Sequence, residues 1–159
     1  MLKQSLLRVA RTTDLVEMKN LLKNAKQQMQ LTGVQQWTSQ YPTDSELRID
    51  IQAASLLVLG EPIIGAVTVA QRTDVWVFKR LMVHEAGRGR GLATKILSEL
   101  MMLGASQGVQ HFQIATHPTN VAMVHLLRKL NFQECGRYIA PGREQLGEFI
   151  QFDRLTVSY

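Results

Sequence analysis

The sequence predicts an α/β fold in a single domain that spans residues 1–159. Apolar residues recur at spacings of three and four in some segments, which is typical of amphipathic helices. Other segments alternate apolar and polar residues or form short apolar runs, which indicates strands. These segments follow one another as strand, two helices, three strands, helix, strand, helix and two strands. The chain has the size of one domain, and it contains no internal repeat, low-complexity stretch or linker.

The chain begins with one expected strand and one expected helix. The alternation over about residues 3–10 predicts the strand. Asp14 is then expected to cap a helix whose apolar stripe runs from Leu15 to Met29. Gly33 interrupts this pattern, so we expect the helix to end there.

The segment between Val34 and Asp50 has no regular period and is expected to form a lid or a substrate wall. Thr43 followed by Glu46 indicates a short helix within it. Trp37 and Tyr41 are large aromatic residues in a polar stretch. They either staple this segment to the core or line a pocket, and the sequence favours neither.

Six further strands and two further helices complete the pattern. The hairpin signal Gly60-Glu61-Pro62 separates two apolar runs, and a long alternating segment follows. The expected strands cover residues 54–59, 63–70, 75–83, 112–115, 132–139 and from about 146 to 156, with helices after Gly91 and after Asn120.

The most informative segment, residues 81–93, joins an apolar strand to a glycine-rich turn and then to a helix. Gly87, Gly89 and Gly91 allow the main chain to approach an anion closely. The amides of residues 88–93 are free at the start of the helix, where the helix dipole also attracts negative charge. The glycine spacing is that of neither the P-loop nor the dinucleotide fingerprint. We therefore predict a pyrophosphate site of another kind.

Two motifs give this chain a family resemblance. Arg88, Gly91 and Ala93 form Arg-x-x-Gly-x-Ala after a strand that ends in Leu-x-Val. This resembles the pyrophosphate loop of the GNAT superfamily of acetyl-coenzyme A-dependent N-acetyltransferases. About thirty residues later, residues 116–132 resemble the family's Asn-helix-Phe segment, with Asn120 as its Asn. The order of elements is also the GNAT order, so the resemblance covers essentially the whole chain.

The resemblance implies a fold, an activity and a cofactor site. The fold is a mixed, mostly antiparallel sheet of about seven strands with about four flanking helices, splayed between the fourth and fifth strands. The activity is direct transfer of an acetyl group from acetyl-CoA to a primary amine of a small molecule or a protein N-terminus. The residues implied to bind acetyl-CoA are Leu81, Met82, Val83, Arg88, Gly89, Arg90, Gly91, Leu92, Ala93, Thr94, Asn120 and Leu127.

The resemblance narrows to a bacterial subgroup that implies no particular substrate. The residues that carry it are Gln36-Trp37 with Tyr41-Pro42, Asp50-Ile51, Thr116-His117 with Asn120 and Met123, and Cys135-Gly136. The chain departs from similar proteins at Ala115, where Asp is usual, and at Asn131, where Gly is usual. Homodimers are common among similar proteins.

The sequence offers His117 and Tyr138 as catalytic candidates. Many GNAT enzymes have a tyrosine that can protonate the departing thiolate, and the matching position here is Leu127. Tyr138 on the following strand could replace this tyrosine as the acid, or it could be an aromatic strand residue without a catalytic role. His117, at the end of the strand before the Asn120 helix, is the candidate base. The alternative for His117 is a hydrogen bond to a loop backbone.

The acceptor candidates are Trp37, Tyr41, Glu46 and Asp50, all in the irregular segment. The two carboxylates could hold a cationic substrate or relay a proton, but solvated helix carboxylates explain them equally well. Because this segment has few acidic residues, a small amine, or an amine that also carries a carboxylate, is favoured over a polycation.

Composition limits the other function classes. The net charge of +5 and the isoelectric point near 9.7 imply affinity for anions, which the phosphates of coenzyme A would satisfy. A nucleic-acid module is disfavoured because the basic residues are scattered and only 6% of residues are aromatic. Four histidines without a paired spacing and one cysteine predict no metal site.

Localisation and the role of Cys135 are also expectations from the sequence. The lack of a signal sequence and of a long apolar run favours a cytoplasmic protein without a membrane partner. Cys135 is expected to be a small buried strand residue. The runner-up function is an acetyl-CoA-binding sensor with little turnover.

Overall fold

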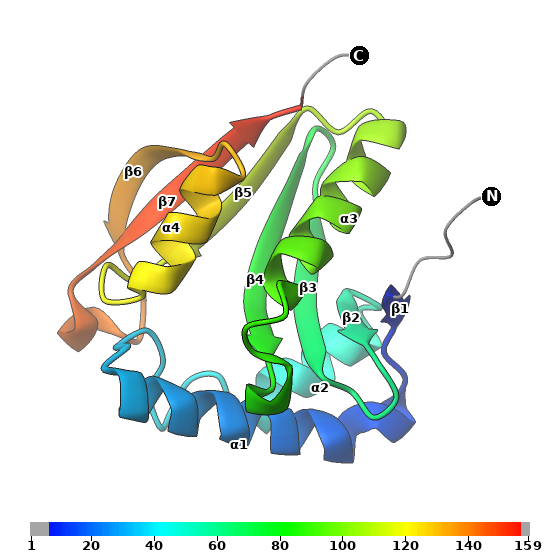
Figure 1. Cartoon of the computed structure of the whole chain (residues 1–159), viewed down its shortest axis with the longest axis vertical. Helices are drawn as coiled ribbons and strands as arrows, with labels where there is room; N and C mark the ends of the chain where they lie inside the picture. Colours follow the sequence, from blue (N-terminus) through cyan, green and yellow to red (C-terminus); the bar gives the residue numbers. More distant parts are fainter. Residues whose placement is uncertain (1–6, 157–159) are drawn as a thin grey trace.

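The computed structural model describes residues 7–156 and confirms the predicted order of helices and strands (Figure 1). The part of the predicted first strand before Leu7 lies outside the described residues. The elements are β1 (Leu7–Val9), η1 (Thr12–Asp14), α1 (Leu15–Thr32), α2 (Asp44–Gln52), β2 (Leu56–Leu59), β3 (Gly65–Gln71), β4 (Val75–Val83), η2 (Glu85–Gly87), α3 (Leu92–Ser106), β5 (His111–Thr116), α4 (Val121–Lys129), β6 (Gln133–Ile139), η3 (Glu144–Leu146) and β7 (Glu148–Leu155).

The strands form one sheet in the order β1-β2-β3-β4-β5-β7-β6. Neighbouring strands are antiparallel except β4 and β5, which are parallel. The β4–β5 pairing runs from Val75 opposite His111 to Phe78 opposite Ile114. Beyond Phe78 the two strands diverge toward α1, as Figure 1 shows. The sheet is therefore mixed, mostly antiparallel and splayed between its fourth and fifth strands, as predicted.

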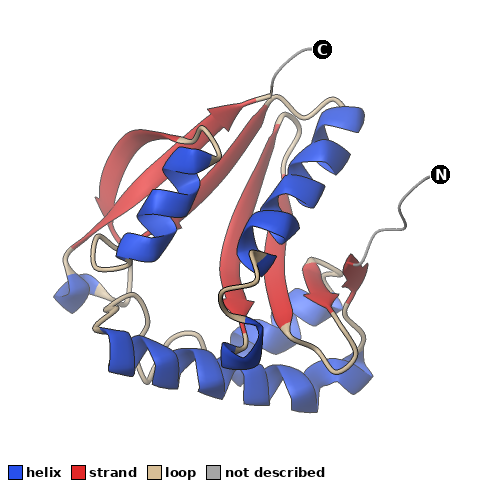
Figure 2. Cartoon of the chain, viewed as in Figure 1, coloured by secondary structure: helices blue, strands red, loops and turns tan. Residues whose placement is uncertain are grey.

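Helices cover both faces of the sheet (Figure 2). On one face, α3 and α4 pack on a core that includes Phe78, Phe112, Leu127 and Phe152. On the other face, α1 and α2 pack on a second core, and α1 crosses the end of the sheet at which β4 and β5 diverge. Helices α1, α3 and α4 thus surround the opening between β4 and β5.

Several helix ends follow the local sequence signals. Gly33 has a φ of 76° after α1, and Asn131 has a φ of 65° after α4, so both adopt the left-handed conformation. Asn120 caps α4, because its Oδ1 accepts a hydrogen bond from the amide of Met123 at 3.2 Å.

Two local expectations are wrong. Asp14 stands before α1 but does not cap it, since its carboxylate accepts hydrogen bonds from the Arg8 guanidinium at 2.8 and 2.9 Å and from the Arg11 amide at 2.7 Å. These contacts, with those of Arg8 the largest, lower the pKa of Asp14 to about 2. Cys135 is exposed rather than buried, because β6 is an edge strand whose residues are all exposed.

Candidate functional site

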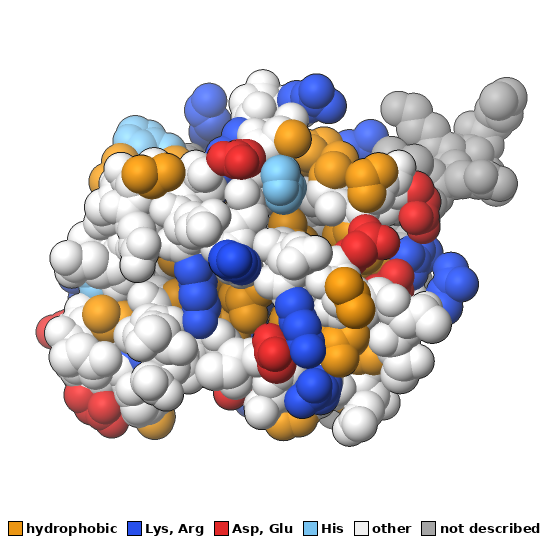
Figure 3. Space-filling view, turned by 90° about the horizontal axis from the view of Figure 1, so that it is seen from below, with side chains coloured by type: hydrophobic (Ala, Val, Ile, Leu, Met, Phe, Trp, Pro, Cys, Tyr) orange, Lys and Arg blue, Asp and Glu red, His pale blue; other side chains and the backbone are white. Residues whose placement is uncertain are grey.

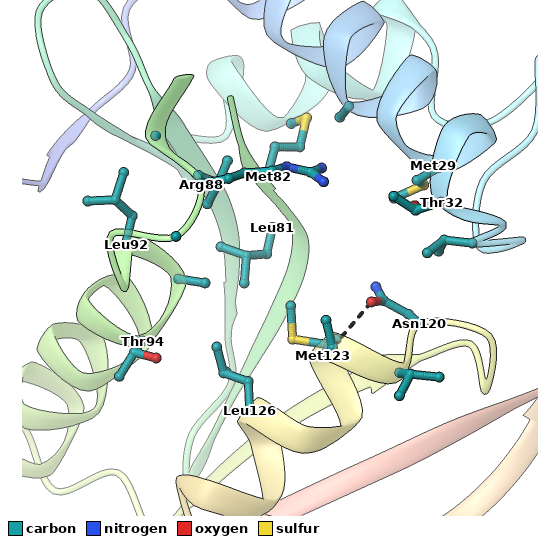
Figure 4. A pocket seen from close by; sticks show the side chains of 18 of the residues that line it. Met29, Thr32, Leu81, Met82, Arg88, Leu92, Thr94, Asn120, Met123 and Leu126 are labelled. Carbon is teal, nitrogen blue, oxygen red and sulfur yellow. Dashed lines mark hydrogen bonds between the residues drawn. The ribbon is translucent and has the colours of Figure 1, made fainter. Parts of the chain in front are cut away.

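A cavity of about 550 Å³ lies in the opening between β4 and α4 (Figure 4). Its walls come from α1, the end of β4, the turn before α3 and the first turns of α3 and α4. The lining residues are Ala25, Met29, Thr32, Val34, Leu81, Met82, Val83, Gly87, Arg88, Gly89, Gly91, Leu92, Ala93, Thr94, Thr119, Asn120, Val121, Ala122, Met123 and Leu126. All the residues expected to bind acetyl-CoA line this cavity except Arg90 and Leu127.

The end of β4 forms one wall and leaves backbone groups available. Leu81, Met82 and Val83 lie beyond Phe78, the last residue that pairs with β5. Their edge toward the opening therefore has no strand partner among the described residues. An extended ligand could use these amides and carbonyls as an added strand would.

A β-bulge lies just before this wall. Ala66 pairs with Met82 and Thr68 with Lys79, so Arg80 and Leu81 together oppose a single β3 residue. Arg80 has a φ of 51°, which is unusual for a residue that is not glycine. The surroundings hold this conformation, because the Arg80 Nε and Nη2 donate to the two oxygens of the buried Asp50, each at 2.8 Å.

The turn before α3 presents free amides. Gly89 has a φ of 75° and Gly91 a φ of 69°, so both positions favour glycine. A Cβ added at either glycine would meet no protein atom within 4 Å, which leaves open space beside the turn. Gly91 is the residue before α3 and its cap position makes no side-chain hydrogen bond to the helix. The first amides of α3 thus remain available to an anion at the positive end of the helix.

Gly87 has a different role from the other two glycines of this turn. It is buried, and a Cβ there would come within 2.6 Å of Leu92 Cδ1. The glycine is required for close packing of the turn against α3. The turn is also tied to α1, because Gln28 Nε2 donates to Glu85 Oε2 at 2.6 Å and Asn24 Oδ1 accepts from the Glu85 amide at 3.1 Å.

The opposite wall belongs to α4, and here the expectation for Leu127 is wrong. Leu127 is 0% exposed and packs into the core with α3, so it does not reach the cavity. Met123 and Leu126 point into the cavity instead (Figure 4). Because successive residues of a helix point in different directions, Leu126 and Leu127 face opposite environments.

The segment after α1 is fixed to the start of α4. Gln36 Oε1 accepts hydrogen bonds from Thr116 Oγ1 at 2.8 Å and from Asn120 Nδ2 at 3.2 Å. The amide of Gln35 donates to Thr119 Oγ1 at 2.8 Å. These contacts bridge the two halves of the splayed sheet at its open end and give the cavity a boundary there.

His117 is 6% exposed, and both of its ring nitrogens have partners. Its Nδ1 accepts from the Thr119 amide at 3.2 Å and lies 2.7 Å from Thr119 Oγ1. Its Nε2 lies 2.6 Å from the Leu146 carbonyl, an oxygen that can only accept a hydrogen bond. The structure therefore shows the hydrogen bond to a loop backbone that was the alternative to a base. His117 does not line the cavity.

The acceptor candidates also lie outside the cavity. Asp50 is paired with Arg80 and accepts from Thr68 Oγ1 at 2.7 Å. Glu46 accepts from the Thr43 amide and hydroxyl, both at 2.6 Å. Although burial opposes it, these bonds lower the pKa of Glu46, so this carboxylate belongs to the cap of α2. Trp37 packs against the core under α1 and α2, which supports its role as a staple.

Tyr41 and Tyr138 contribute hydroxyl groups near the end of β6. Tyr41 Oη accepts from Arg80 Nη1 at 2.7 Å. Tyr138 is 38% exposed and stacks on Phe149, with ring centroids 6.0 Å apart. Burial raises the pKa of Tyr138, so its phenol is protonated at neutral pH and can donate a hydrogen bond.

Arg88 is the one ionisable side chain among the described residues that line the cavity. Its guanidinium points into the cavity from the turn before α3 (Figure 4). The rest of the lining is apolar or neutral polar. The cavity is therefore suited to a ligand with an apolar or amide-like arm and an anionic end.

The sequence did not reveal the contribution of α1 to this cavity. Ala25, Met29 and Thr32 lie on one side of α1, at spacings of four and three residues. That spacing marks a helix face, but it does not distinguish a face that lines a cavity from one that is buried in a core.

Residues 7–156 contain neither a cluster of metal-binding side chains nor a membrane-spanning helix. No group of three or more His, Cys, Asp or Glu side chains is arranged to hold a metal ion in this part of the chain. None of the helices described is long and apolar enough to cross a membrane.

Comparisons with known proteins agree on one family. The sequence model of the Acetyltransferase (GNAT) family matches residues 18–132. No curated protein matches the chain.

Three solved structures illustrate the similarity in fold. A GNAT-family acetyltransferase from Streptococcus agalactiae has a TM-score of 0.81 at 22% identity, over 96% of this chain and 95% of that one. The ribosomal-protein-S18-alanine N-acetyltransferase from Escherichia coli has a TM-score of 0.75 at 16% identity, over 96% and 94%. An acetyltransferase from Salmonella typhimurium, solved with its cofactor acetyl-CoA, has a TM-score of 0.71 at 17% identity, over 96% and 94%.

Proposed function

Because the chain belongs to the acetyltransferase (GNAT) family, we propose that it transfers the acetyl group of acetyl-CoA directly to a primary amine. The acceptor is a small molecule or a protein N-terminus. Two similar folds support this reading, since one is a ribosomal-protein-S18-alanine N-acetyltransferase and another was solved with acetyl-CoA.

The main support for this proposal is the set of chemical groups that line the cavity. The cavity wall contains the free amides of the turn before α3 together with Arg88, and it also contains the unpaired edge of β4. The amides and Arg88 would hold a pyrophosphate. The backbone at Leu81, Met82 and Val83 would pair with the amide-bearing pantetheine arm. Space is available, because neither Gly89 nor Gly91 has a protein atom near its missing side chain.

The chain contributes positioning and hydrogen bonds rather than a covalent intermediate. When bound, acetyl-CoA would supply a thioester whose carbonyl carbon bonds to the acceptor nitrogen as the carbon–sulfur bond breaks, with the nitrogen's proton passing to solvent or to sulfur. An amide at the end of β4 would donate to the thioester oxygen. Holding the amine and the thioester in fixed geometry supplies much of the rate enhancement.

The residues around the cavity restrict how a proton can move. Arg88 cannot act as a base at neutral pH, and no other described lining residue is ionisable. Tyr138 would remain the candidate acid as a protonated phenol. A proton taken up at Nδ1 of His117 would break the hydrogen bond that this nitrogen accepts from the Thr119 amide. We therefore propose that the acceptor amine loses its proton to water.

A second function has one observation in its favour. The position that corresponds to the tyrosine acid of many relatives is Leu127, which is fully buried. A cavity without an ionisable group other than Arg88 would also suit a protein that binds acetyl-CoA and reports its presence. This sensor would bind the cofactor but release no thiol with any amine.

The face of the molecule that carries α1 does not favour nucleic-acid binding. On the face that carries α1, seen from below in Figure 3, basic side chains are interspersed with acidic, polar and hydrophobic ones. Such a surface offers no continuous basic track for a phosphate backbone.

Calorimetric titration of acetyl-CoA, followed by thiol release across a panel of amines, tests the proposal. Binding with amine-dependent thiol release is the expected result. Binding without release would favour the sensor, and the absence of binding would overturn the assignment of the cavity.

A further inference from the structure

Arg143, between β6 and η3, occupies an unusual position next to the cavity. Its guanidinium carbon lies 4.0 Å from the centroid of the Tyr41 ring and 4.8 Å from that of Phe149. Its Nη1 donates to the Gln36 carbonyl at 3.1 Å. The cation is thus placed between two aromatic rings and a carbonyl.

The remaining edge of this guanidinium has no partner. Arg143 Nε is the only buried side-chain nitrogen or oxygen between residues 7 and 156 that lacks a hydrogen bond. No carboxylate within that range forms an ion pair with Arg143. The neighbouring Glu144 is turned away, since its Oε1 accepts from the Gly142 amide at 2.9 Å.

A buried donor without a hydrogen-bond partner costs free energy, so the unpaired Arg143 Nε requires a physical reason. Arg80 provides the contrast within the same protein, because Asp50 neutralises it through two hydrogen bonds. Arg143 has no such counter-ion. An external carboxylate would supply this missing counter-ion at the half-buried guanidinium.

Two hydroxyl groups lie beside this cation. Tyr138 stacks on Phe149, which also contacts Arg143, and its phenol has no hydrogen-bond partner among those described. Tyr41 Oη accepts from Arg80, which leaves its own proton free to donate. The group as a whole presents donors and positive charge.

Covalent neighbours and hydrogen bonds join this group to the cavity. Gln36, whose carbonyl binds Arg143, also binds Asn120, and Asn120 lines the cavity. On the other side, Tyr41 binds Arg80, which directly precedes Leu81 in the cavity wall. Through Gln36 and Tyr41, the guanidinium is therefore connected to two parts of the cavity wall.

We propose that the acceptor is an amine that also carries a carboxylate, and that Arg143 binds this carboxylate. The proposal rests on the proposed function and adds a substrate class and a specificity residue to it. An amino acid, or a related small molecule with its amine and carboxylate a few bonds apart, fits this arrangement. The contrasting view is that Arg143 only holds the segment around Gln36 and Tyr41 in place.

Matched pairs of acceptors distinguish these views. Amino acids and their carboxamides are compared as acceptors by thiol release, for the native protein, Arg143→Met and Arg143→Lys. Arg137→Met serves as the control, because Arg137 is exposed on the same hairpin and pairs with Glu134. Acetyl-CoA affinity and thermal unfolding are measured for every variant.

We expect the native protein to prefer the acid over its amide by about 10–100-fold in kcat/KM, which is the value of one charge-assisted hydrogen bond. Arg143→Met should lose this preference through KM while retaining acetyl-CoA affinity. Arg143→Lys should keep part of it, and Arg137→Met all of it. A merely structural Arg143 would lower the rates with acid and amide equally.

The test does not depend on turnover. If acetyl-CoA binds but no amine is acetylated, calorimetry with coenzyme A and the N-acetylated acids and amides makes the same comparison. Tighter binding of the acid that Arg143→Met abolishes would support the proposal. Equal binding, binding of neither compound, or a preference that survives Arg143→Met would overturn it. Failure of acetyl-CoA itself to bind would instead overturn the proposed function.

Discussion

Substitution of Gly91 by Val probes the turn before α3 most directly. Gly91 has a φ of 69°, and a residue with a side chain costs about 1–2 kcal/mol in this conformation. For a protein of this size, that loss corresponds to a decrease in Tm of roughly 2–8 °C. A Cβ at this position meets no protein atom within 4 Å, so the new side chain begins in open space. The fold should therefore persist.

Binding of acetyl-CoA should suffer much more than stability. The new side chain would occupy the open space beside the α3 amides, where we place the pyrophosphate. Loss of one charge-assisted hydrogen bond costs about 1.5–3 kcal/mol, which corresponds to at least a tenfold weaker affinity. Calorimetric titration of acetyl-CoA measures this directly.

Gly108 provides a matched control at the other end of α3. Its φ is 83°, and a Cβ there also meets no protein atom within 4 Å, but it does not line the cavity. Gly108→Val should lose a similar amount of stability and retain native affinity for acetyl-CoA. If Gly91→Val binds acetyl-CoA as tightly as Gly108→Val does, the turn is not the pyrophosphate site.

Three other changes are predicted to separate ligand binding from stability. Arg88→Gln should weaken acetyl-CoA binding about tenfold and reduce the salt dependence of binding. Arg90 is exposed and lies outside the cavity, so Arg90→Gln should bind acetyl-CoA normally. Equal effects of the two substitutions in calorimetry would contradict the assignment of Arg88. Leu127→Ala should lower the free energy of unfolding by about 2–5 kcal/mol without a specific loss of acetyl-CoA affinity. Leu126→Ala should weaken acetyl-CoA binding at a smaller cost in stability. If denaturant and binding titrations rank the two variants in the opposite order, Leu127 belongs to the site. Because the folded-state pKa of Asp14 is about 2, below its ordinary value of 3.8, the stability that its carboxylate contributes is present above pH 4 and is lost as the pH falls toward 2. Asp14→Asn should therefore be less stable than the native protein by on the order of 1–2 kcal/mol at pH 7 and equally stable near pH 2. A difference in urea unfolding that does not change with pH would refute this reasoning.

The fold was largely predictable because its signals are local. The periodicity of each helix and strand, the cap at Asn120 and the left-handed exits at Gly33 and Asn131 depend on residues that are close in sequence. The turn before α3 was predictable for the same reason, since its glycines and the helix start lie within a few residues of one another. The error at Asp14 arose because the nearby Arg8 pairs with its carboxylate, which a cap pattern does not reveal. The error at Cys135 arose because the edge position of β6 depends on the whole sheet.

The acceptor candidates show where sequence reasoning fails. Glu46 and Asp50 have the chemistry to bind an amine, but neighbours occupy both carboxylates, Thr43 in the first case and Arg80 in the second. Arg143 had no signal in the sequence at all. Its isolation between Tyr41 and Phe149 exists only because the 36–41 segment packs against the β6–β7 hairpin.

The sequence by itself determined the order of the elements, the glycine-rich turn before α3 and the family of the chain. These features follow from spacing along one segment, and spacing sets backbone direction without reference to the rest of the molecule. The tertiary structure alone decided which side of α4 faces the cavity, that α1 closes one of its walls, and that Arg143 keeps an unpaired edge next to it. Those properties depend on which groups are neighbours in space, because only neighbours can neutralise a charge, satisfy a donor or exclude water.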